Sequence, residues 1–319
     1  MNNFLEIENE IKEINKNLKD KYDSFFKSSK EDFREDILKK IGEISKLEKL
    51  KEDQLKNFGI VVGVDGSVNK MGGNFPHYLE LYRALAKPTK GEDIYLNRYY
   101  TPLTDNIEID VEQSKRRQML AAIEVDVAIQ AIKEIKPRLL MMDGGLIRYK
   151  IDYKEGFEKL VDLCKEKDII LIGVLKELKT NVISRAIGVD ESIFDRELLY
   201  GKLNIGDFIL IDDAFNKKSG ENEGELSSGF LRTSNSAMAI GIDILSEQKK
   251  YIKDAANLVY SLTPYNSRGV PLWLDIVDKE VRVTDQFMKS MLEEYMDRDI
   301  YERFFISERD RRSLWKLSV

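Results

Sequence analysis

Apolar residues near the start of the chain recur at alternating steps of three and four, with Lys and Glu filling many of the positions between them. The positions with this spacing are Phe4, Ile7, Ile11, Ile14 and Leu18. The spacing predicts an amphipathic helix with a coiled-coil-like seam. It breaks near residues 24–36, and the stripe then resumes at Ile37, Ile41, Ile44, Leu47 and Leu50. We therefore predict a helical arm over residues 1–57, which is either a pair of ordinary packing helices or a surface for oligomerisation or partner docking.

The period changes at Phe58, where FGIVVGVDGS forms a short, continuous apolar run that ends in turn residues. Such a run is typical of a buried central strand. Two extended segments, near residues 77–86 and 93–102, are expected to follow as antiparallel neighbours, and a long helix is expected over about 111–135. Three later apolar runs, RLLMMDGGL, DIILIGVLK and DFILIDDAF, predict further buried strands, with a helix at about 154–166 between the first two.

The C-terminal third has a weaker pattern. We expect a loop over residues 217–228, mostly helix over 237–262, an extended VPLWLDIVDKEVRV segment and a helical tail from Asp285. The order of a strand, two strands, a helix and a strand is that of a ribonuclease-H-like sheet, and it differs from a doubly wound sheet, in which strands and helices alternate from the start. The sequence thus predicts an α/β fold, with a ribonuclease-H-like mixed sheet flanked by helices over residues 58–319.

Composition and charge exclude several kinds of site and partner. The 319 residues carry 51 Lys and Arg against 57 Asp and Glu, a net charge of −6 that argues mildly against nucleic-acid binding but allows a local basic channel. The single cysteine, Cys164, excludes a disulfide within the chain and a Cys-rich zinc site, and the single histidine, His77, excludes an H-E-x-x-H site. No apolar run approaches the roughly 18 residues of a membrane helix, and the N-terminus lacks a signal-peptide core, so we expect a cytoplasmic protein without membrane contact.

Two aspartates, Asp65 and Asp143, each end a predicted core strand and are each followed by glycine. The carboxyl ends of strands in α/β sheets are where ligands bind, and glycine permits a tight turn and a close approach of substrate. Two carboxylates on adjacent strands repel each other unless a cation lies between them. Because Mg²⁺ and Mn²⁺ prefer oxygen ligands, the pair predicts a divalent-metal site.

A third carboxylate, Glu124, falls in the middle of the apolar face of the predicted long helix. At 100° per residue, the following residues lie within about 60° of it: Leu120, Ala121, Val127, Ala128, Ala131 and Ile135. Burying a lone charge is costly, so Glu124 should be paired or bound to metal. Asp126 falls on the opposite side, whereas Arg117, in the Lys115-Arg116-Arg117 cluster, lies two turns before Glu124 on the same face, where it can meet a phosphate. Each feature alone has an ordinary structural explanation, but their combination favours a metal site.

VVGVDGS, the helix that carries Glu124 and LLMMDGG together resemble the NurA family of DNA-repair nucleases, from about residue 50 to the tail. The resemblance implies a ribonuclease-H-like fold with a helical N-terminal arm. It also implies that the metal-binding carboxylates are Asp65, Glu124 and Asp143. Lys176, in GVLKELKT, matches a basic residue at the end of the following strand that could hold the scissile phosphate.

The C-terminus departs from the family pattern. Family members often carry a PYPL-type stretch followed by a His or Asp that completes the site, whereas this chain has YERFFISERDRRS and no His there. Asp310 is the candidate fourth metal ligand, with Glu308 as one alternative and a merely charged terminal helix as another.

The resemblance implies a largely sequence-independent DNA nuclease that uses two Mg²⁺ or Mn²⁺ ions. Its expected activities are 5′-to-3′ exonuclease and single-strand endonuclease, with the backbone positioned by Lys115, Arg116, Arg117 and Arg185. A homodimer and a hexameric HerA-type ATPase translocase are the implied partners, in resection of double-strand breaks or in phage defence. Two alternatives stay open: a non-catalytic assembly subunit of a translocase complex, and an actin- or hexokinase-like ATPase.

Overall fold

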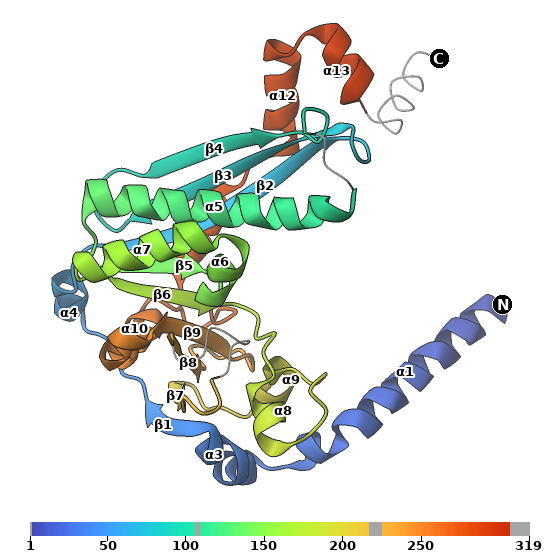
Figure 1. Cartoon of the computed structure of the whole chain (residues 1–319). Coiled ribbons are helices and arrows are strands. Elements are labelled where there is room, and N and C mark those ends of the chain that lie inside the picture. The colour runs from blue at the N-terminus through green and yellow to red at the C-terminus, as the bar shows by residue number, and fades with distance from the viewer. Residues whose placement is uncertain (1, 106–108, 217–224, 307–319) are drawn as a thin grey trace.

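The computed structural model describes residues 2–105, 109–216 and 225–306, and its centre is one mixed β-sheet (Figure 1). Nine strands in these residues lie in the order β1-β7-β8-β9-β6-β5-β2-β3-β4. The β2–β5 and β5–β6 pairs are parallel, and the other neighbouring pairs are antiparallel. The strands are β1 Gly42–Lys46, β2 Val61–Gly72, β3 Tyr78–Pro88, β4 Ile94–Tyr100, β5 Leu139–Asp143, β6 Ile170–Leu175, β7 Asp207–Ile211, β8 Leu226–Leu231 and β9 Ile240–Leu245.

Helices cover both faces of the sheet. On one face lie α5 (Ile109–Ile135) and α7 (Lys154–Glu166), which Figure 1 shows running across the strands, and on the other α10 (Ile252–Ser261) and α11 (Leu272–Val281). A strand covered on both faces must be apolar at every position, because successive side chains point to opposite sides. The continuous apolar runs of β2, β5 and β6 follow from this position in the middle of the sheet.

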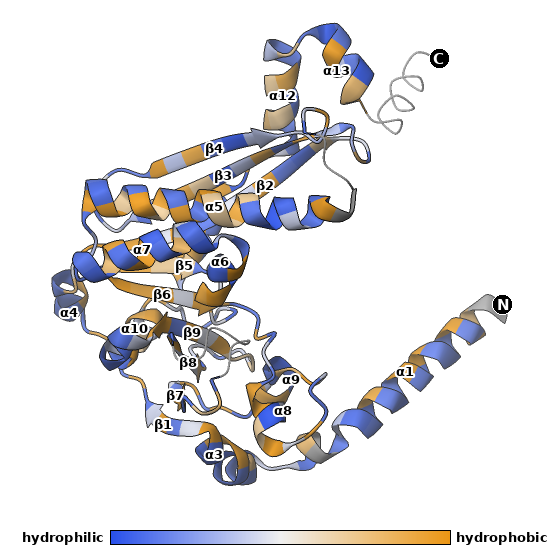
Figure 2. Ribbon diagram, in the orientation of Figure 1, coloured by the Kyte–Doolittle hydropathy of each residue, from blue (hydrophilic) through white to orange (hydrophobic). Residues whose placement is uncertain are grey.

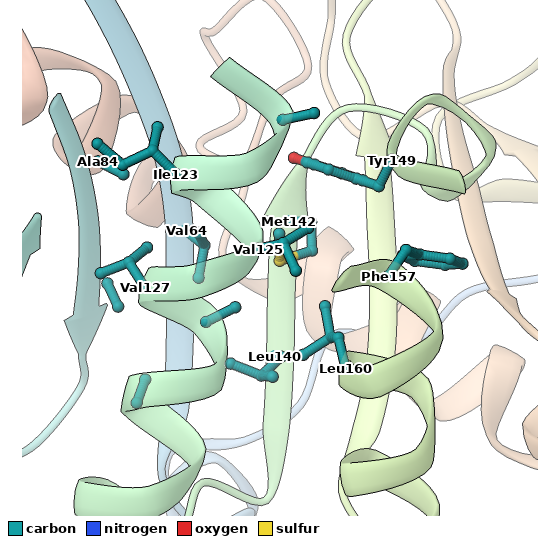
Figure 3. Packing of buried hydrophobic residues seen from close by; sticks show 14 of the residues in the cluster. Val64, Ala84, Ile123, Val125, Val127, Leu140, Met142, Tyr149, Phe157 and Leu160 are labelled. Carbon is teal, nitrogen blue, oxygen red and sulfur yellow. The ribbon is translucent and has the colours of Figure 1, made fainter. Parts of the chain in front are cut away.

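The two faces of the central strands pack into different clusters. Val64 and Met142 lie on the face covered by α5, where Figure 3 shows them beneath Val125 of that helix. Their neighbours Val61 and Met141 point the other way, into the cluster that includes residues of α10 and α11. This alternation decides which way the aspartates further along β2 and β5 point.

β2 is longer than the sequence predicted, and it continues past the end of β5. Its first residues, Val61–Val64, pair with Leu139–Met142, whereas its antiparallel pairing with β3 runs from Val62 to Gly72. Asp65 is therefore the fifth residue of a twelve-residue strand, and the prediction that it ends the strand is wrong. What ends at this point is the pairing with β5. The prediction for Asp143 is confirmed, since it is the last residue of β5.

The N-terminal region contains one long helix, α1 (Asn2–Lys27), that projects from the body (Figure 1). The predicted second helix is wrong at Gly42–Lys46, which forms the edge strand β1 and pairs with β7. Asp207 of β7 explains this placement, because its buried carboxylate pairs with Arg34 at 3.0 Å and with Lys46 at 2.6 Å. The division of the chain at residue 57 stays a prediction.

The C-terminal third differs most from expectation. Strands β8 and β9 replace the end of the predicted loop and the start of the predicted helix over 237–262, and only α10 and the preceding 3₁₀ turn are helical there. The segment expected to be extended is helix α11. Its buried residues, Leu274, Val277 and Val281, have the three- and four-residue spacing of a helix, which its β-branched composition obscured.

The remaining helices are short. They are α2 Lys30–Phe33, the π-helical η1 Arg34–Leu38, α3 Lys39–Ile41, α4 Glu52–Asn57, α6 Leu146–Asp152, α8 Val182–Ile187, α9 Asp195–Leu199, the 3₁₀ turn η3 Ser246–Tyr251, α12 Asp285–Tyr295 and α13 Arg298–Phe304. Within the described residues, no helix combines the length and apolar character needed to cross a membrane.

Candidate active site

Asp65 and Asp143 meet at the point where β2 runs past the end of β5. Asp65 follows Val64, whose partner across the β2–β5 pair is Met142, and Asp143 follows Met142. By the alternation along each strand, both carboxylates point to the face covered by α11. The two carboxyl groups share a hydrogen bond, and both are largely buried, with Asp65 only 8% exposed.

The environment of this pair opposes two negative charges. Burial, the charge of Asp143 and the charge of Glu124 together raise the pKa of Asp65 to about 8, against the opposing influence of Lys176 and of the Gly66 N–H, which donates to Asp65 at 2.8 Å. Burial also raises the pKa of Asp143, although its ion pair with Lys176 opposes the rise. A carboxyl with the pKa of Asp65 holds a proton at pH 7 and releases it when another cation binds.

Glu124 reaches the same place from α5, on the opposite face of the sheet. Its side chain is 1% exposed, and it lies directly against Gly66 of β2. A Cβ atom at residue 66 would lie 2.5 Å from Glu124 Oε1, so glycine leaves the room that this carboxylate occupies. Burial raises the pKa of Glu124, and contacts with Arg148 and Tyr149 oppose the rise.

A second carboxylate on α5, Asp126, has the different environment that helical spacing predicts. It lies two residues from Glu124, is 28% exposed and forms an ion pair with Arg98 of β4. The two carboxylates of one helix thus differ in burial and in neighbours, which makes Asp126 a matched control for Glu124.

Two basic side chains neutralise part of this acidic cluster. Lys176, just after β6, forms an ion pair with Asp143, and Arg148 of α6 forms one with Glu124. Sequence analysis singled out Lys176 but missed Arg148. The available signal was its position: α6 begins immediately after the Asp143-Gly144-Gly145 turn, so its first turn has to lie beside the site.

A fourth carboxylate comes from α11. The charge of Asp278 raises the pKa of Asp143, and Asp278 itself pairs with Arg282 at 2.6 Å. Sequence analysis missed Asp278, because it treated this segment as extended and placed the C-terminal ligand further along. The residues it favoured there, Asp310 and Glu308, lie outside the described residues.

The basic residues expected to contact DNA have partners within the protein. Arg116 pairs at 2.5 Å with Glu80, a fully buried carboxylate of β3, so its guanidinium helps to hold α5 on the sheet. Lys115 lies 3.8 Å from Asp105. Arg117, 59% exposed, lies 3.7 Å from Asp152.

Arg185, the fourth of these residues, is exposed on α8. Its charge acts on Asp195 of α9. Arg185 is thus associated with the α8–α9 corner.

The donor set suits Mg²⁺ or Mn²⁺, because it consists of carboxylates whose mutual repulsion a divalent cation would relieve. As the side chains lie, no group of three Asp, Glu, His or Cys residues in the described part of the chain converges on one ion position. Glu124 and Asp143 are each turned toward a basic side chain instead.

Comparison with known proteins agrees with this fold. The crystal structure of the NurA nuclease from Sulfolobus solfataricus matches with a TM-score of 0.60 and 14% identity, over 92% of this chain and 94% of that one. The catalytic domain of human endonuclease V matches with a TM-score of 0.39 and 18% identity, over 73% of this chain and 84% of that one. The crystal structure of Kluyveromyces polysporus Argonaute with a guide RNA matches with a TM-score of 0.34 and 9% identity, over 74% of this chain and 29% of that one. Among curated protein sequences none matches.

The predicted fold class, a ribonuclease-H-like mixed sheet with an N-terminal helical arm, is confirmed. The family model of the NurA domain matches residues 59–283, which include Asp65, Glu124, Asp143 and Asp278. This chain belongs to the NurA family.

Proposed function

We propose that this protein is a metal-dependent DNA nuclease. The observation that supports this most is that Asp65, Asp143 and Glu124 lie close together where β2 passes the end of β5. Burial raises the pKa of each, and the charge of at least one other acidic residue adds to each rise. Perturbed carboxyls gathered at one place are characteristic of functional sites. Membership of the NurA family and the fold shared with a NurA nuclease agree with the proposal.

Each residue has a distinct role in the proposed reaction. Asp65 and Asp143 would hold two Mg²⁺ or Mn²⁺ ions between them, and Glu124 would hold one of them or orient the attacking water. When bound, such ions activate water and stabilise the leaving oxygen of a phosphodiester. Lys176 would bind the scissile phosphate. Contacts of this kind position the backbone without reading bases, so cleavage would be largely independent of sequence.

The test compares how substitutions at two carboxylates of α5, Glu124 and Asp126, change the rate at which one DNA substrate is cleaved. We expect end-labelled single-stranded DNA to be degraded with Mn²⁺ or Mg²⁺ and to stay intact with EDTA. Glu124→Gln should lower the rate at least about 100-fold, since it removes a charged group from the site. Asp126→Asn makes the same change two residues away and should stay within about threefold of wild type. Substrates labelled at the 5′ or the 3′ end would also test the proposed 5′-to-3′ polarity and the endonuclease activity.

Two results would count against this function. Equal rates for wild type and Glu124→Gln would mean that the site is wrong. A wild type that is inactive with both metals, even beside a hexameric HerA-type translocase, would favour the non-catalytic assembly subunit.

We further propose that α1 serves the assembly of a homodimer and the docking of a HerA-type hexamer, in DNA end resection. The helix is held at its base, where Lys21 donates to Ser192 at 2.7 Å. Beyond it, Figure 2 shows hydrophobic residues recurring along α1. Several of them are exposed, including Phe4 at 81% and Ile11 at 61%. Such a stripe with coiled-coil spacing stabilises a helix only when a partner covers it. Light scattering is expected to give twice the mass of one chain.

A further inference from the structure

The ion pair between Arg148 and Glu124 joins two helices, α5 and α6, that pack against each other beside the site. Glu124 comes from the middle of α5, and Arg148 from the first turns of α6, just after Asp143. The carboxylate is 1% exposed and the guanidinium side chain 36%, so the pair lies at the boundary between the core and solvent. A carboxylate this buried requires a counter-charge, and Arg148 supplies it.

The Arg148 guanidinium contacts Tyr149 as well as Glu124. It lies over the ring of Tyr149, 4.5 Å from the centroid, and hydrogen-bonds with that residue. Its Nε atom, however, is buried without a hydrogen-bond partner in the described residues. Elsewhere in the fold, a buried carboxylate such as Asp207 is fixed by two basic side chains at once. Glu124, in contrast, pairs with one basic side chain, Arg148, and a competing divalent cation can replace that one charge.

Besides Arg148, the Glu124 carboxylate has two further neighbours. Gly66 of β2 borders it on one side, and Tyr149, whose hydroxyl lies 3.2 Å from the Asp143 carbonyl oxygen, hydrogen-bonds with it on the other. Glu124 therefore stays close to Asp65 and Asp143, and it has only to turn from Arg148 toward an incoming cation.

We propose that Arg148 is a built-in counter-ion that holds the Glu124 carboxylate until a divalent cation replaces it. The inference rests on the proposed metal-dependent function, and it assigns to Arg148 a positioning role that precedes the reaction. It also accounts for the absence of three converging carboxylates in the described residues, since Glu124 is turned toward Arg148 and Asp143 toward Lys176. Binding of the cation is then an exchange of one positive charge for another.

The test measures Mn²⁺ binding to the full chain by calorimetry, apart from any cleavage. Arg148→Met removes the competing charge, so Mn²⁺ should bind about tenfold more tightly than to wild type, whereas Arg148→Lys should stay within about threefold. Arg117→Met removes an equal charge from the exposed surface of α5 and should change the affinity less than twofold. The melting temperature of Arg148→Met should be lower than that of wild type without metal, and should rise more when Mn²⁺ is added.

The outcomes separate this inference from the function on which it rests. Affinity that is unchanged or weaker in Arg148→Met, with wild type binding Mn²⁺, would overturn the counter-ion role alone. Failure of wild type and Arg148→Met alike to bind Mn²⁺ would overturn the metal site as well. If Arg148→Met does not fold, the double variant Arg148→Met/Glu124→Gln removes both charges. It should fold, and it should not show the tenfold gain; a gain in this variant would mean that Glu124 is not where the exchange occurs.

Discussion

Two buried aspartates in this protein are stabilised in opposite ways. Asp195, at the α8–α9 corner, is fully buried and accepts hydrogen bonds from Thr180 Oγ1 at 2.5 Å, Val182 N at 3.0 Å and Ile183 N at 2.8 Å. Asp65 is almost as buried, but it accepts a backbone N–H from Gly66 and faces other acidic groups.

This difference is the one expected between a carboxylate that stabilises the fold and one that serves the proposed function. Burial raises the pKa of both groups. Around Asp195, three hydrogen bonds oppose the rise and anchor the start of α8. Around Asp65, the charges of Asp143 and Glu124 add to the rise. A buried carboxylate with many donors stabilises the fold, whereas one surrounded by like charges costs stability that a bound cation can restore.

The largest expected effect is on catalysis at Asp65. Asp65→Asn should lower DNA cleavage at least about 1,000-fold, because a neutral amide would hold the proposed metal ions much less well than a carboxylate does. The same change should leave the melting temperature equal to or above that of the wild type at pH 8, since it removes like-charge repulsion. Cleavage rates and thermal melts of the same preparation check both. A fall in both together would mean that Asp65, like Asp195, serves mainly to hold the fold.

The reverse result is expected for Asp195. Asp195→Ala leaves two backbone N–H groups and a hydroxyl without their acceptor, so the free energy of unfolding should fall by about 3 kcal/mol. Cleavage per folded molecule should remain within about threefold of wild type. Denaturant titration and rate measurements on the soluble fraction provide the numbers. If Asp195→Ala leaves the free energy of unfolding unchanged, Asp195 does not stabilise the fold and does not differ from Asp65 in this way.

A smaller effect concerns pH. The pKa of Asp65 rises from 3.8 to about 8 on folding, so the folded chain binds a proton there that the unfolded chain lacks between these values. The contribution of Asp65 to stability is therefore full below pH 4 and is lost as the pH rises through about 8. Thermal melts in EDTA should show this decline in wild type and a shallower one in Asp65→Asn, where Asp195 and other groups still titrate. Parallel curves would contradict the assignment.

The central strands could be predicted from the sequence because their apolar pattern fits one kind of structure, a strand buried on both faces. VVGVDGS and LLMMDGG are apolar at successive positions, which is required of strands covered on both faces, and each run leads directly to an aspartate. Glu124 followed from the helical period alone. Asp65, Asp143 and Glu124 could therefore be picked out from the local sequence around each of them.

The misassigned elements have patterns that fit more than one structure. IGIDIL forms β9 although a helix was expected, and LWLDIVDKEV forms α11 although a strand was expected. Short apolar runs fit a buried strand or a buried helix equally well, and the packing of the neighbouring elements decides between them. Asp278 was missed for this reason, since its nearness to Asp143 depends on α11 crossing β2.

By itself, the sequence determined the order of the central elements, the apolar faces of β2, β5 and α5, and the acidic residues that interrupt those faces. Only the tertiary structure decided that β2 runs on past β5, that Gly66 makes room for Glu124, and that Arg148 and Lys176 neutralise two of the three carboxylates. The reason is that the pattern of a sequence reflects local structure, whereas these contacts join residues far apart in the chain. Periodicity reports which side of an element faces the core, whereas a pair such as Arg148 and Glu124 forms only when two distant elements pack together.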